Sequence, residues 1–533
     1  MSGSVLMVQG TTSDAGKSFL TAGLLRLFRR RGLKVAPFKA QNMALNAVVT
    51  PDGREIGRAQ GEQAKAAGLP PHVDMNPILL KPESGHRSQV VVLGRSRGSM
   101  TYRAYQELKH ELRPIVLSAL HRLRDQFDLV IIEGAGSPAE INLDGDIVNM
   151  FIARSARAPV ILVTDIDRGG AFASLYGTWS LLAPEDRDLV KGFVMNRIRG
   201  DPSLLDSGNR KLLELTGIPV LGAVPYLEEH RVPEEDSLGL DRRRWTPRAH
   251  LRDVEVTIVD LPHMSNYDEF QSLERRVTVR YSAAARDGLG TDLVIIPGSK
   301  RTIEDLRWIR SSGWSRVLET RHASRKPILG ICGGCQMLGR SLHDRSGIET
   351  RGDFEGLGLL PLSTVFEPEK RTRPVWVEPV VPPFDRASIQ GRLPGYEIHH
   401  GRVRLDEDAA PFARVMPQPA GPFRADGAWN DSTIGTMVHG LFEHPASIDS
   451  LVQWIHSRSE ASPPATSRRP TSEPSAEAHP EPSVAPSGVE GSTLSYPEDP
   501  YEALAVVLER ALDIPALEHL LSQSTLHPRS RRG

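Results

Sequence analysis

The sequence is poor in cysteine: its 533 residues include only Cys332 and Cys335. So few thiols exclude a disulfide framework and favour a reducing, cytoplasmic location. A structural zinc site is also disfavoured, because such a site usually has four ligands, commonly from two cysteine pairs, and this chain has one pair.

The sequence also lacks long apolar segments and an excess of either charge. No apolar run approaches the ~20 residues that span a bilayer, and the apolar residues 4–8 are too short for a secretory signal. Lysine and arginine total 65, aspartate and glutamate total 66, and the net charge is −1. Such a balance provides no general basic field for nucleic acid or an anionic membrane. We therefore expect neither as a partner.

What the sequence does contain is an alternation of β-rich and helical segments over residues 1–231. This alternation predicts a doubly wound parallel α/β sheet, and the length of the chain predicts two to four domains. A helix is predicted over Lys17–Arg31, ended by Gly32. The predicted strands are Ser4–Gln9, Lys34–Phe38, Leu129–Ile132, Val160–Val163, Gly192–Met195 and Val220–Val224.

A second doubly wound α/β domain is predicted over residues 253–457, after a polar linker at 232–252. Residues 458–499 are rich in Ser, Pro, Glu and Ala, cannot bury a core and are predicted to be a disordered insertion. Helical periodicity returns over 500–522, which we expect to dock on the second domain, before a disordered tail at 523–533. The predicted strands of the second domain are Val254–Val259, Leu293–Ile296, Ile328–Ile331 and Ile434–Val438.

A phosphate-binding loop is predicted between the first strand and the first helix. Residues 10–18, Gly-Thr-Thr-Ser-Asp-Ala-Gly-Lys-Ser, have one residue more than the standard G-x-x-x-x-G-K-[ST] pattern but keep its strand–loop–helix context. Lys17 is predicted to reach the terminal phosphates of ATP, and the Ser18 hydroxyl to bind Mg²⁺. The predicted nucleotide-binding residues of the loop are Thr11, Thr12, Asp14, Gly16, Lys17 and Ser18.

Polar residues at the ends of other strands extend this predicted ATP site. Glu133 and Asp165 each follow an apolar strand, where a carboxylate is well placed for Mg²⁺ or its water shell. Lys39 ends the second strand and is predicted to steady a transferring phosphoryl group as a catalytic residue. Asn196 is predicted to read an adenine edge. For Lys39 and Asn196, an ordinary loop residue is an equally good interpretation.

A second site is predicted around Cys332, in Gly-Ile-Cys-Gly-Gly-Cys-Gln at residues 330–336. A strand followed by this sharp turn indicates a nucleophile elbow, and Cys335 is interpreted as a small core residue. A thiol needs a base, for which His439 at a strand end is favoured over His399. The oxyanion of the tetrahedral intermediate would be bound by backbone N–H groups, and the predicted donors are Gly298 and Gly333.

Several long segments of the sequence together resemble those of cobyric acid synthases. The elbow, the Pro-Gly-Ser-Lys turn at 297–300 and His-Gly-Leu-Phe at 439–442 resemble a class I glutamine amidotransferase domain with a flavodoxin-like sheet, and the N-terminal half resembles the dethiobiotin-synthetase-like ATPases. The resemblance covers nearly all of residues 1–457 and the final helix. The matching segments of the N-terminal half are residues 7–18, 38–46, 75–82 and 165–170.

This resemblance implies a substrate and a reaction. Cobyric acid synthases amidate the b, d, e and g carboxylates of adenosylcobyrinic acid a,c-diamide, a corrinoid of the cobalamin pathway, and use ATP, Mg²⁺, water and L-glutamine as the ammonia donor. Many amidotransferases of this class have a glutamate two residues after the histidine, where this chain has Leu441. A Cys332–His439 dyad is therefore expected, with no assigned role for the nearby Glu443. The insertion at 458–499 is not part of the family pattern.

Two alternatives remain open at the level of sequence. Cobyrinic acid a,c-diamide synthase performs the same chemistry on other corrin carboxylates, although Gln-Asn-Met at 41–43 and Asn-Pro at 76–77 favour cobyric acid synthase. A partitioning-type P-loop ATPase, which acts as a switch, has the same deviant loop but does not need the thiol elbow. The sequence does not predict an oligomeric state.

Overall fold

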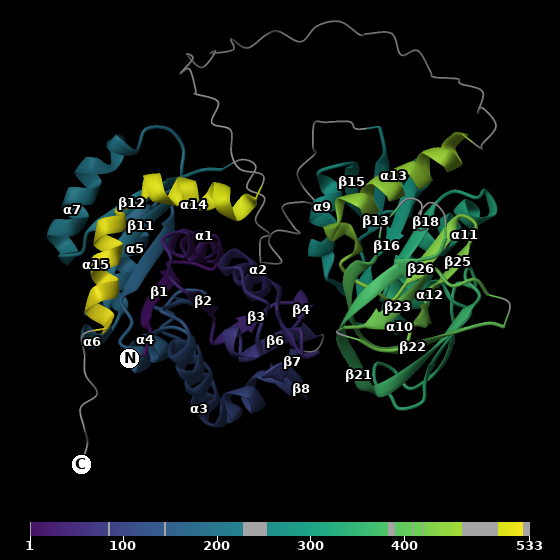
Figure 1. Ribbon diagram of the computed structural model, residues 1–533, viewed down its shortest axis with the longest axis horizontal. Helices are drawn as coiled ribbons and strands as arrows, with labels where there is room; N and C mark the ends of the chain where they lie inside the picture. The colour runs from purple at the N-terminus through teal and green to yellow at the C-terminus, as the bar shows by residue number, and fades with distance from the viewer. Residues whose placement is uncertain are drawn as a thin grey trace, which may run out of the picture.

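The computed structural model contains two α/β bodies, the first purple to blue and the second teal to green in Figure 1. The structure describes residues 2–83, 86–142, 145–227, 253–381, 389, 391–407, 409–418, 420–460 and 499–525. The predicted linker at 232–252 lies outside the described residues, as does most of the predicted insertion. No helix of the described residues is long and apolar enough to cross a membrane.

The first body is built on a six-stranded, entirely parallel sheet, as predicted. The strands alternate their side chains between the two faces: Val5 and Met7 pack on one face, and Leu6 and Val8 on the other. Helices therefore cover both faces, which makes the sheet doubly wound. In spatial order the strands are β12 (Val220–Pro225), β11 (Val190–Ile198), β10 (Val160–Asp165), β1 (Ser4–Gly10), β9 (Leu129–Glu133) and β2 (Val35–Phe38).

The helices of this body flank the central sheet. The predicted first helix is α1 (Lys17–Arg30), after which Gly32 has a φ of 89°. A smaller sheet, which the sequence analysis did not predict, lies beside the main one. Its strands are β3 (Gln41–Met43), β6 (Ile78–Glu83), β7 (Arg87–Val92) and β8 (Arg95–Thr101), and β4 (Ala47–Val49) pairs separately with β5 (Glu55–Gly57). The other main helices are α2 (Arg58–Ala67), α3 (Tyr102–Gln126), α4 (Met150–Ala156), α5 (Ala171–Leu181) and α7 (Asp206–Thr216).

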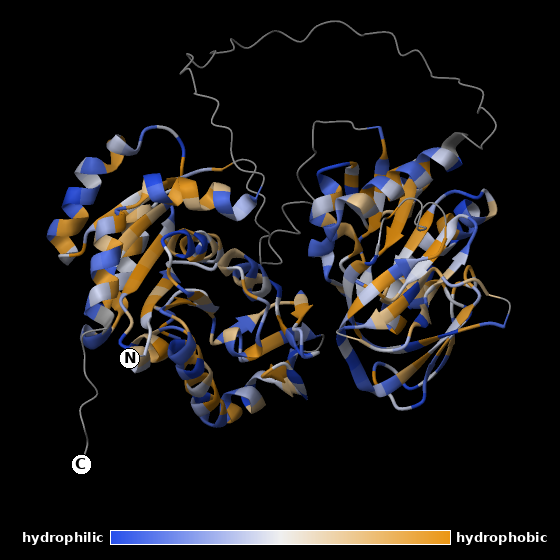
Figure 2. Ribbon diagram, in the orientation of Figure 1, coloured by the Kyte–Doolittle hydropathy of each residue, from blue (hydrophilic) through white to orange (hydrophobic). Residues whose placement is uncertain are grey.

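The second body contains its own mostly parallel sheet, and all four of its predicted strands are present. The hydrophobic strands at the centre of both bodies are orange in Figure 2. The edge strand β25 (Ala428–Asn430) runs antiparallel to β26. The remaining order is β15 (Thr278–Ser282), β13 (Glu255–Val259), β16 (Leu293–Ile296), β18 (Ile328–Ile331) and β26 (Thr433–Thr436). The helices are α9 (Gln271–Glu274), α10 (Thr302–Ser311), α11 (Trp314–Ala323), α12 (Gly333–Leu338) and α13 (Pro445–Glu460).

A further sheet in the second body was not predicted. Its largest unit is a long antiparallel hairpin of β21 (Leu362–Pro379) and β22 (Leu393–Leu405). Its inward side chains join the core of the parallel sheet, so that one hydrophobic core serves both layers. The other strands are β19 (Ser341–Asp344), β20 (Gly352–Glu355), β23 (Ala413–Pro417) and β24 (Arg424–Asp426).

The C-terminal segment corrects one prediction, because it docks on the first body and not on the second. It forms two helices, α14 (Pro500–Ala511) and α15 (Ile514–Thr525), which contact α1, β12 and β1 and are yellow in Figure 1. Leu504 and Leu508 lie against Gly23 of α1, where an added Cβ would come within 2.4 Å of Leu508. The physical reason is that α14 and α15 complete the cover of the sheet face formed by Leu6 and Val8.

Two helices also extend further than predicted, into segments that were expected to be disordered. Helix α13 continues to Glu460, so residues 458–460 of the predicted insertion are helical. Helix α15 continues to Thr525, so residues 523–525 of the predicted tail are helical as well. Residues 461–498 and 526–533 lie outside the described part of the chain. The first body therefore consists of residues from both ends of the sequence.

Candidate active sites

The predicted elbow is present at Cys332, between β18 and α12. Cys332 has a φ of 51° and a ψ of −106°, which is a strained conformation for a residue with a side chain. The next residue, Gly333, has no room for a side chain, because a Cβ there would lie 2.9 Å from the Ser299 backbone nitrogen. The Cys332 N–H donates to the Thr436 carbonyl at 2.7 Å, which fixes the turn to the neighbouring strand β26.

His439 lies at this turn, and an acid that the sequence analysis missed lies next to it. Glu269 Oε1 is 3.0 Å from His439 Nδ1, and Glu269 Oε2 accepts from the Gly440 N–H at 3.2 Å. Burial works to lower the pKa of His439, but the Glu269 carboxylate and the charge and hydrogen bond of Cys332 outweigh it and raise that pKa to about 10. The site can therefore hold an imidazolium between a carboxylate and a sulfur atom.

The expected dyad thus becomes a line of three side chains. Glu269 comes from the short helical turn Tyr267–Phe270, whereas Leu441, at the position where many relatives have a glutamate, is buried among apolar residues. Glu443 does not contact His439, because its carboxylate pairs with Arg58 at 2.7 Å and with Lys65 at 3.3 Å. No local signature in the sequence marks Glu269, which is 170 residues from His439.

Two further side chains enclose the His439 ring. Tyr396 stacks on it, with a centroid distance of 5.4 Å and an interplanar angle of 18°. Asn266 Nδ2 lies 3.4 Å from His439 Nε2, and Asn266 itself has a φ of 54°. His439 is only 1 % exposed. Its orientation is therefore fixed by Tyr396 on one ring face and by Glu269 at Nδ1.

The structure brings the two predicted oxyanion residues into this site. Gly298 belongs to the two-residue strand β17 (Gly298–Ser299), which pairs with β14 (Met264–Ser265). A Cβ on Gly298 would lie 3.2 Å from His439 Cε1, and Gly333 lies against Ser299. The roles of the Gly298 and Gly333 N–H groups in binding an oxyanion stay predictions.

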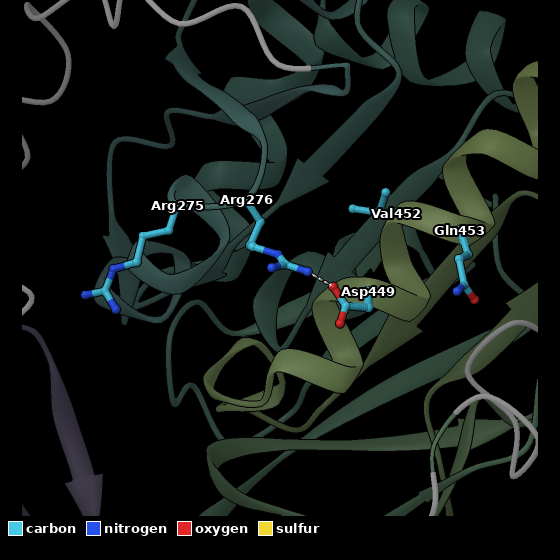
Figure 3. A pocket seen from close by; sticks show the side chains of 5 residues that line it. All are labelled: Arg275, Arg276, Asp449, Val452 and Gln453. Atoms are coloured by element: carbon cyan, nitrogen blue, oxygen red, sulfur yellow. Dashed lines mark hydrogen bonds and ion pairs between the residues drawn. The ribbon is translucent and has the colours of Figure 1, made fainter. Parts of the chain in front are cut away.

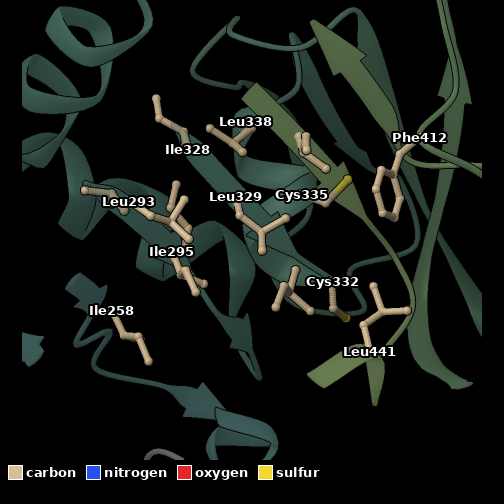
Figure 4. Close-up of a cluster of buried hydrophobic side chains, with 14 of the residues drawn as sticks. Ile258, Leu293, Ile295, Ile328, Leu329, Cys332, Cys335, Leu338, Phe412 and Leu441 are labelled. Atoms are coloured by element: carbon tan, nitrogen blue, oxygen red, sulfur yellow. The ribbon is translucent and has the colours of Figure 1, made fainter. Parts of the chain in front are cut away.

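The structure separates Cys335 and His399 from the site. Cys335 is fully buried in the hydrophobic core of the second body, and burial raises the pKa of its thiol well above the usual value. Figure 4 shows both cysteines among the side chains of that core. His399 Nδ1 lies 2.6 Å from the Gly401 carbonyl and Nε2 lies 3.1 Å from Glu397 Oε1, so both of its ring nitrogens have structural partners.

The predicted phosphate loop joins β1 to α1. Gly16 has a φ of 93° at the start of the helix, and a Cβ there would lie 2.0 Å from Asn196 Nδ2. Lys17 Nζ donates to the carbonyls of Thr12 and Ser13 at 2.8 and 2.9 Å. Thr11 Oγ1 donates to Thr164 Oγ1 at 3.0 Å. The loop is thus held by hydrogen bonds between its own residues and by a hydrogen bond to β10. These contacts keep its shape fixed, as a site for phosphate requires.

The carboxylate of Glu133 gathers the other predicted residues beneath this loop. Ser18 Oγ donates to Glu133 Oε1 at 2.8 Å, and Lys39 Nζ is 2.9 Å from the same oxygen. Gln63 of α2, which the sequence analysis missed, donates to Glu133 Oε2. Ser18 and Glu133 carry oxygen atoms of the kind that Mg²⁺ prefers, and their binding of Mg²⁺ stays a prediction. Among the described residues no cluster of three or more His, Cys, Asp or Glu could hold a metal, so the remaining ligands of Mg²⁺ here would be phosphate oxygens and water.

Asp165 and Asn196 lie at the loop but have protein partners. Asp165 Oδ2 pairs with Arg197 Nη1 at 2.8 Å, and Asn196 Nδ2 donates to the Ala15 carbonyl at 2.9 Å. Asp14, predicted to contact the nucleotide, pairs with Arg168. Metal binding by Asp165 and adenine recognition by Asn196 stay predictions, while the observed contacts show that both side chains brace the loop.

A hollow of about 620 Å³ is found on the second body, away from the residues assigned to either site. Figure 3 shows its lining, which comes from the two residues that follow α9 and from α13, and in which Arg276 pairs with Asp449. None of the lining residues belongs to the phosphate loop or to the thiol site. The full lining is Arg275, Arg276, Asp449, Val452 and Gln453.

Comparisons with known proteins divide the chain in the same way. Residues 6–238 match the CobQ/CobB/MinD/ParA nucleotide binding domain, and residues 255–447 match the CobB/CobQ-like glutamine amidotransferase domain. The first match includes the phosphate loop and Glu133. The second includes Glu269, Cys332 and His439.

Three relatives are similar over most of their length and are each named cobyric acid synthase. The protein from Sorangium cellulosum is 46 % identical, over 86 % of this chain and 92 % of its own. That from Desulforudis audaxviator is 49 % identical, over 85 % and 90 %. That from Klebsiella pneumoniae is 44 % identical, over 86 % and 91 %. This chain therefore belongs to the cobyric acid synthase family and is an enzyme, a glutamine-dependent amide ligase.

Proposed function

We propose that this enzyme amidates the b, d, e and g carboxylates of adenosylcobyrinic acid a,c-diamide, with glutamine as the ammonia donor and ATP as the activating substrate. The observation that supports the proposal is that one chain contains two separate candidate sites. One is the thiol–imidazole–carboxylate line at Cys332, and the other is the phosphate loop above Glu133. The names of the relatives support the corrinoid substrate.

In the proposed glutaminase reaction, the Cys332 sulfur attacks the side-chain amide of glutamine. The imidazolium of His439, held by Glu269, stabilises the negative charge on sulfur and then donates a proton to the amide nitrogen, which leaves as ammonia. The oxyanion of the tetrahedral intermediate would be bound by the N–H groups of Gly298 and Gly333. Water then hydrolyses the thioester and releases glutamate.

In the proposed amidation, a corrin carboxylate attacks the γ-phosphate of ATP, and ADP leaves as the bond between the β- and γ-phosphates breaks. The resulting acyl phosphate is an electrophile, which a free carboxylate is not, and ammonia displaces its phosphate. Lys17 and the loop N–H groups would hold the phosphates, and Lys39 would steady the transferring group. Ser18 and Glu133 would hold Mg²⁺, which when bound offsets the negative charge of the phosphates.

Two substitutions test this division of labour. Cys332→Ala is expected to abolish amidation from glutamine but to leave amidation from added ammonium, because only the ammonia source is lost. Lys17→Ala is expected to abolish both. Amidation is measured by mass spectrometry, and NMR of the product identifies which carboxylates carry amides. Loss of both activities in folded Cys332→Ala, or full activity in Lys17→Ala, would contradict the proposal.

A further inference from the structure

Helix α2 of the first body reaches both sites. Near its middle, Gln63 donates to Glu133 beneath the phosphate loop and is only 1 % exposed. At its first residue, Arg58 contacts the second body. Arg58 and Gln63 are five positions apart, which is about 7.5 Å along a helix axis. A displacement of α2 at one site would therefore be felt at the other, because both contacts are made by the same helix.

Arg58 holds two turns that carry the residues of the thiol site. Its Nε lies 2.9 Å from Asp268 Oδ2, and its Nη1 lies 2.7 Å from Glu443 Oε1. Asp268 directly precedes Glu269, and Glu443 ends the turn that begins after His439. Arg58, a residue of the first body, thus connects the segment that contains Glu269 to the segment that contains His439 in the second body.

The pKa values of the buried acids around Arg58 depend on the charge of its guanidinium. Burial raises the pKa of Asp268, with Arg58 opposing the rise and Glu269 adding to it. Burial also acts to raise the pKa of Glu443, but Arg58 and Lys65 overcome it and lower that pKa to about 2. The Arg58 guanidinium therefore separates acids that would otherwise repel one another and Glu269.

The first body contacts the surroundings of His439 at a second place. The Ala47 N–H of β4 donates to Asn266 Oδ1 at 3.4 Å, and Asn266 Nδ2 faces His439 Nε2. Tyr396, which stacks on His439, also packs in an apolar cluster between the bodies. The remaining members of that cluster are Ala44, Ala47, Val49, Leu79, Val91 and Ile398.

We propose that Arg58 is a positioning residue that couples the ATP site to the thiol site, so that binding of ATP and the acceptor carboxylate sets the geometry of Glu269 and His439. This inference rests on the proposed function, because it concerns how the two reactions of that function are synchronised. Arg58 acts through the turns of Asp268 and Glu443.

The test compares Arg58→Gln with the matched control Lys65→Gln, on the same helix. Lys65 also pairs with Glu443 but does not contact Asp268. Glutamate release is measured with and without ATP and adenosylcobyrinic acid a,c-diamide. Coupling between sites typically corresponds to about 5–150-fold, so we expect stimulation in that range for the wild type and Lys65→Gln, and less than about twofold for Arg58→Gln. The loss should be in kcat, with KM for glutamine and ammonium-dependent amidation retained.

Further variants distinguish positioning from simple support of the fold. Arg58→Lys, which keeps the charge but not the planar fork, is expected to restore part of the stimulation. Asp268→Asn changes the other partner of the contact and is expected to reduce the stimulation of glutamate release. If Arg58→Gln does not fold, Asp268→Asn serves as the test of the inference. Undiminished stimulation in Arg58→Gln or Asp268→Asn would overturn the inference, as would loss of ammonium-dependent amidation in folded Arg58→Gln. A wild type that performs no ATP-dependent amidation would instead refute the proposed function.

Discussion

His439 is buried between a carboxylate and a thiol, and this surrounding determines what the residue can do. The pKa of about 10 means that its imidazole carries a proton throughout the neutral range, and in the proposed reaction this proton goes to the amide nitrogen that leaves glutamine as ammonia. The sequence identifies Cys332 and His439 because each follows a strand at a glycine turn. It does not identify Glu269, because the contact joins turns 170 residues apart and only the fold brings them together.

Glu269→Gln should slow the glutaminase reaction without affecting amidation from ammonium. Removal of the carboxylate lowers the pKa of His439, so the alkaline limb of the pH profile of kcat/KM should move from about 10 to lower pH. We expect kcat for glutamate release to fall roughly 10²-fold, in line with the usual contribution of acid–base catalysis. Glu274→Gln is the control, because Glu274 bonds to the Tyr281 hydroxyl. An alkaline limb that stays at the same pH would show that Glu269 does not determine the pKa of His439.

Among the elements, the central parallel strands of both bodies were predictable, whereas the parallel edge strand β15 and the additional sheets of both bodies were not. A strand such as β9 is buried on both faces and therefore has a continuous apolar sequence that ends at a glycine turn. The hairpin strand β21 instead alternates buried and half-exposed residues and contains charged ones, so its sequence carries a weaker signal. The docking of α14 was mispredicted for a related reason: an amphipathic pattern shows that a face is buried but not against which body.

Leu508→Ala should destabilise the first body more than the second. Leu508 is fully buried against Gly23, and removing such a side chain typically costs about 2–5 kcal/mol. After stepwise heating, ammonium-dependent amidation should be lost at a lower temperature than in the wild type, whereas glutamate release should persist to nearly its wild-type temperature. Arg510→Ala, an exposed position on the same helix, should change neither. Earlier loss of glutamate release alone would favour docking on the second body.

At the scale of the whole molecule, the chain passes between the two bodies twice, after residue 227 and again after residue 460. The contact between them is partly ionic and buried. Lys370 Nζ of β21 lies 3.0 Å from both carboxylate oxygens of Glu55, which is 2 % exposed and also pairs with Lys81. Burial acts to raise the pKa of Glu55, but Lys370 and Lys81 overcome it and lower that pKa far below its usual value. Glu55 is therefore a fixed anion that is paired with one cation from each body.

Lys370→Glu should separate the two reactions while each body stays folded. It places a carboxylate against Glu55, and breaking a buried ion pair costs about 3–5 kcal/mol, enough to weaken the contact between the bodies. Glutamate release and ammonium-dependent amidation should both persist, but glutamate should be produced in excess of amide, with free ammonia in solution. Lys326→Glu, an exposed charge reversal on the same body, should keep the two products equal. Equal yields of glutamate and amide in Lys370→Glu would mean that the Glu55–Lys370 contact does not hold the bodies together during transfer.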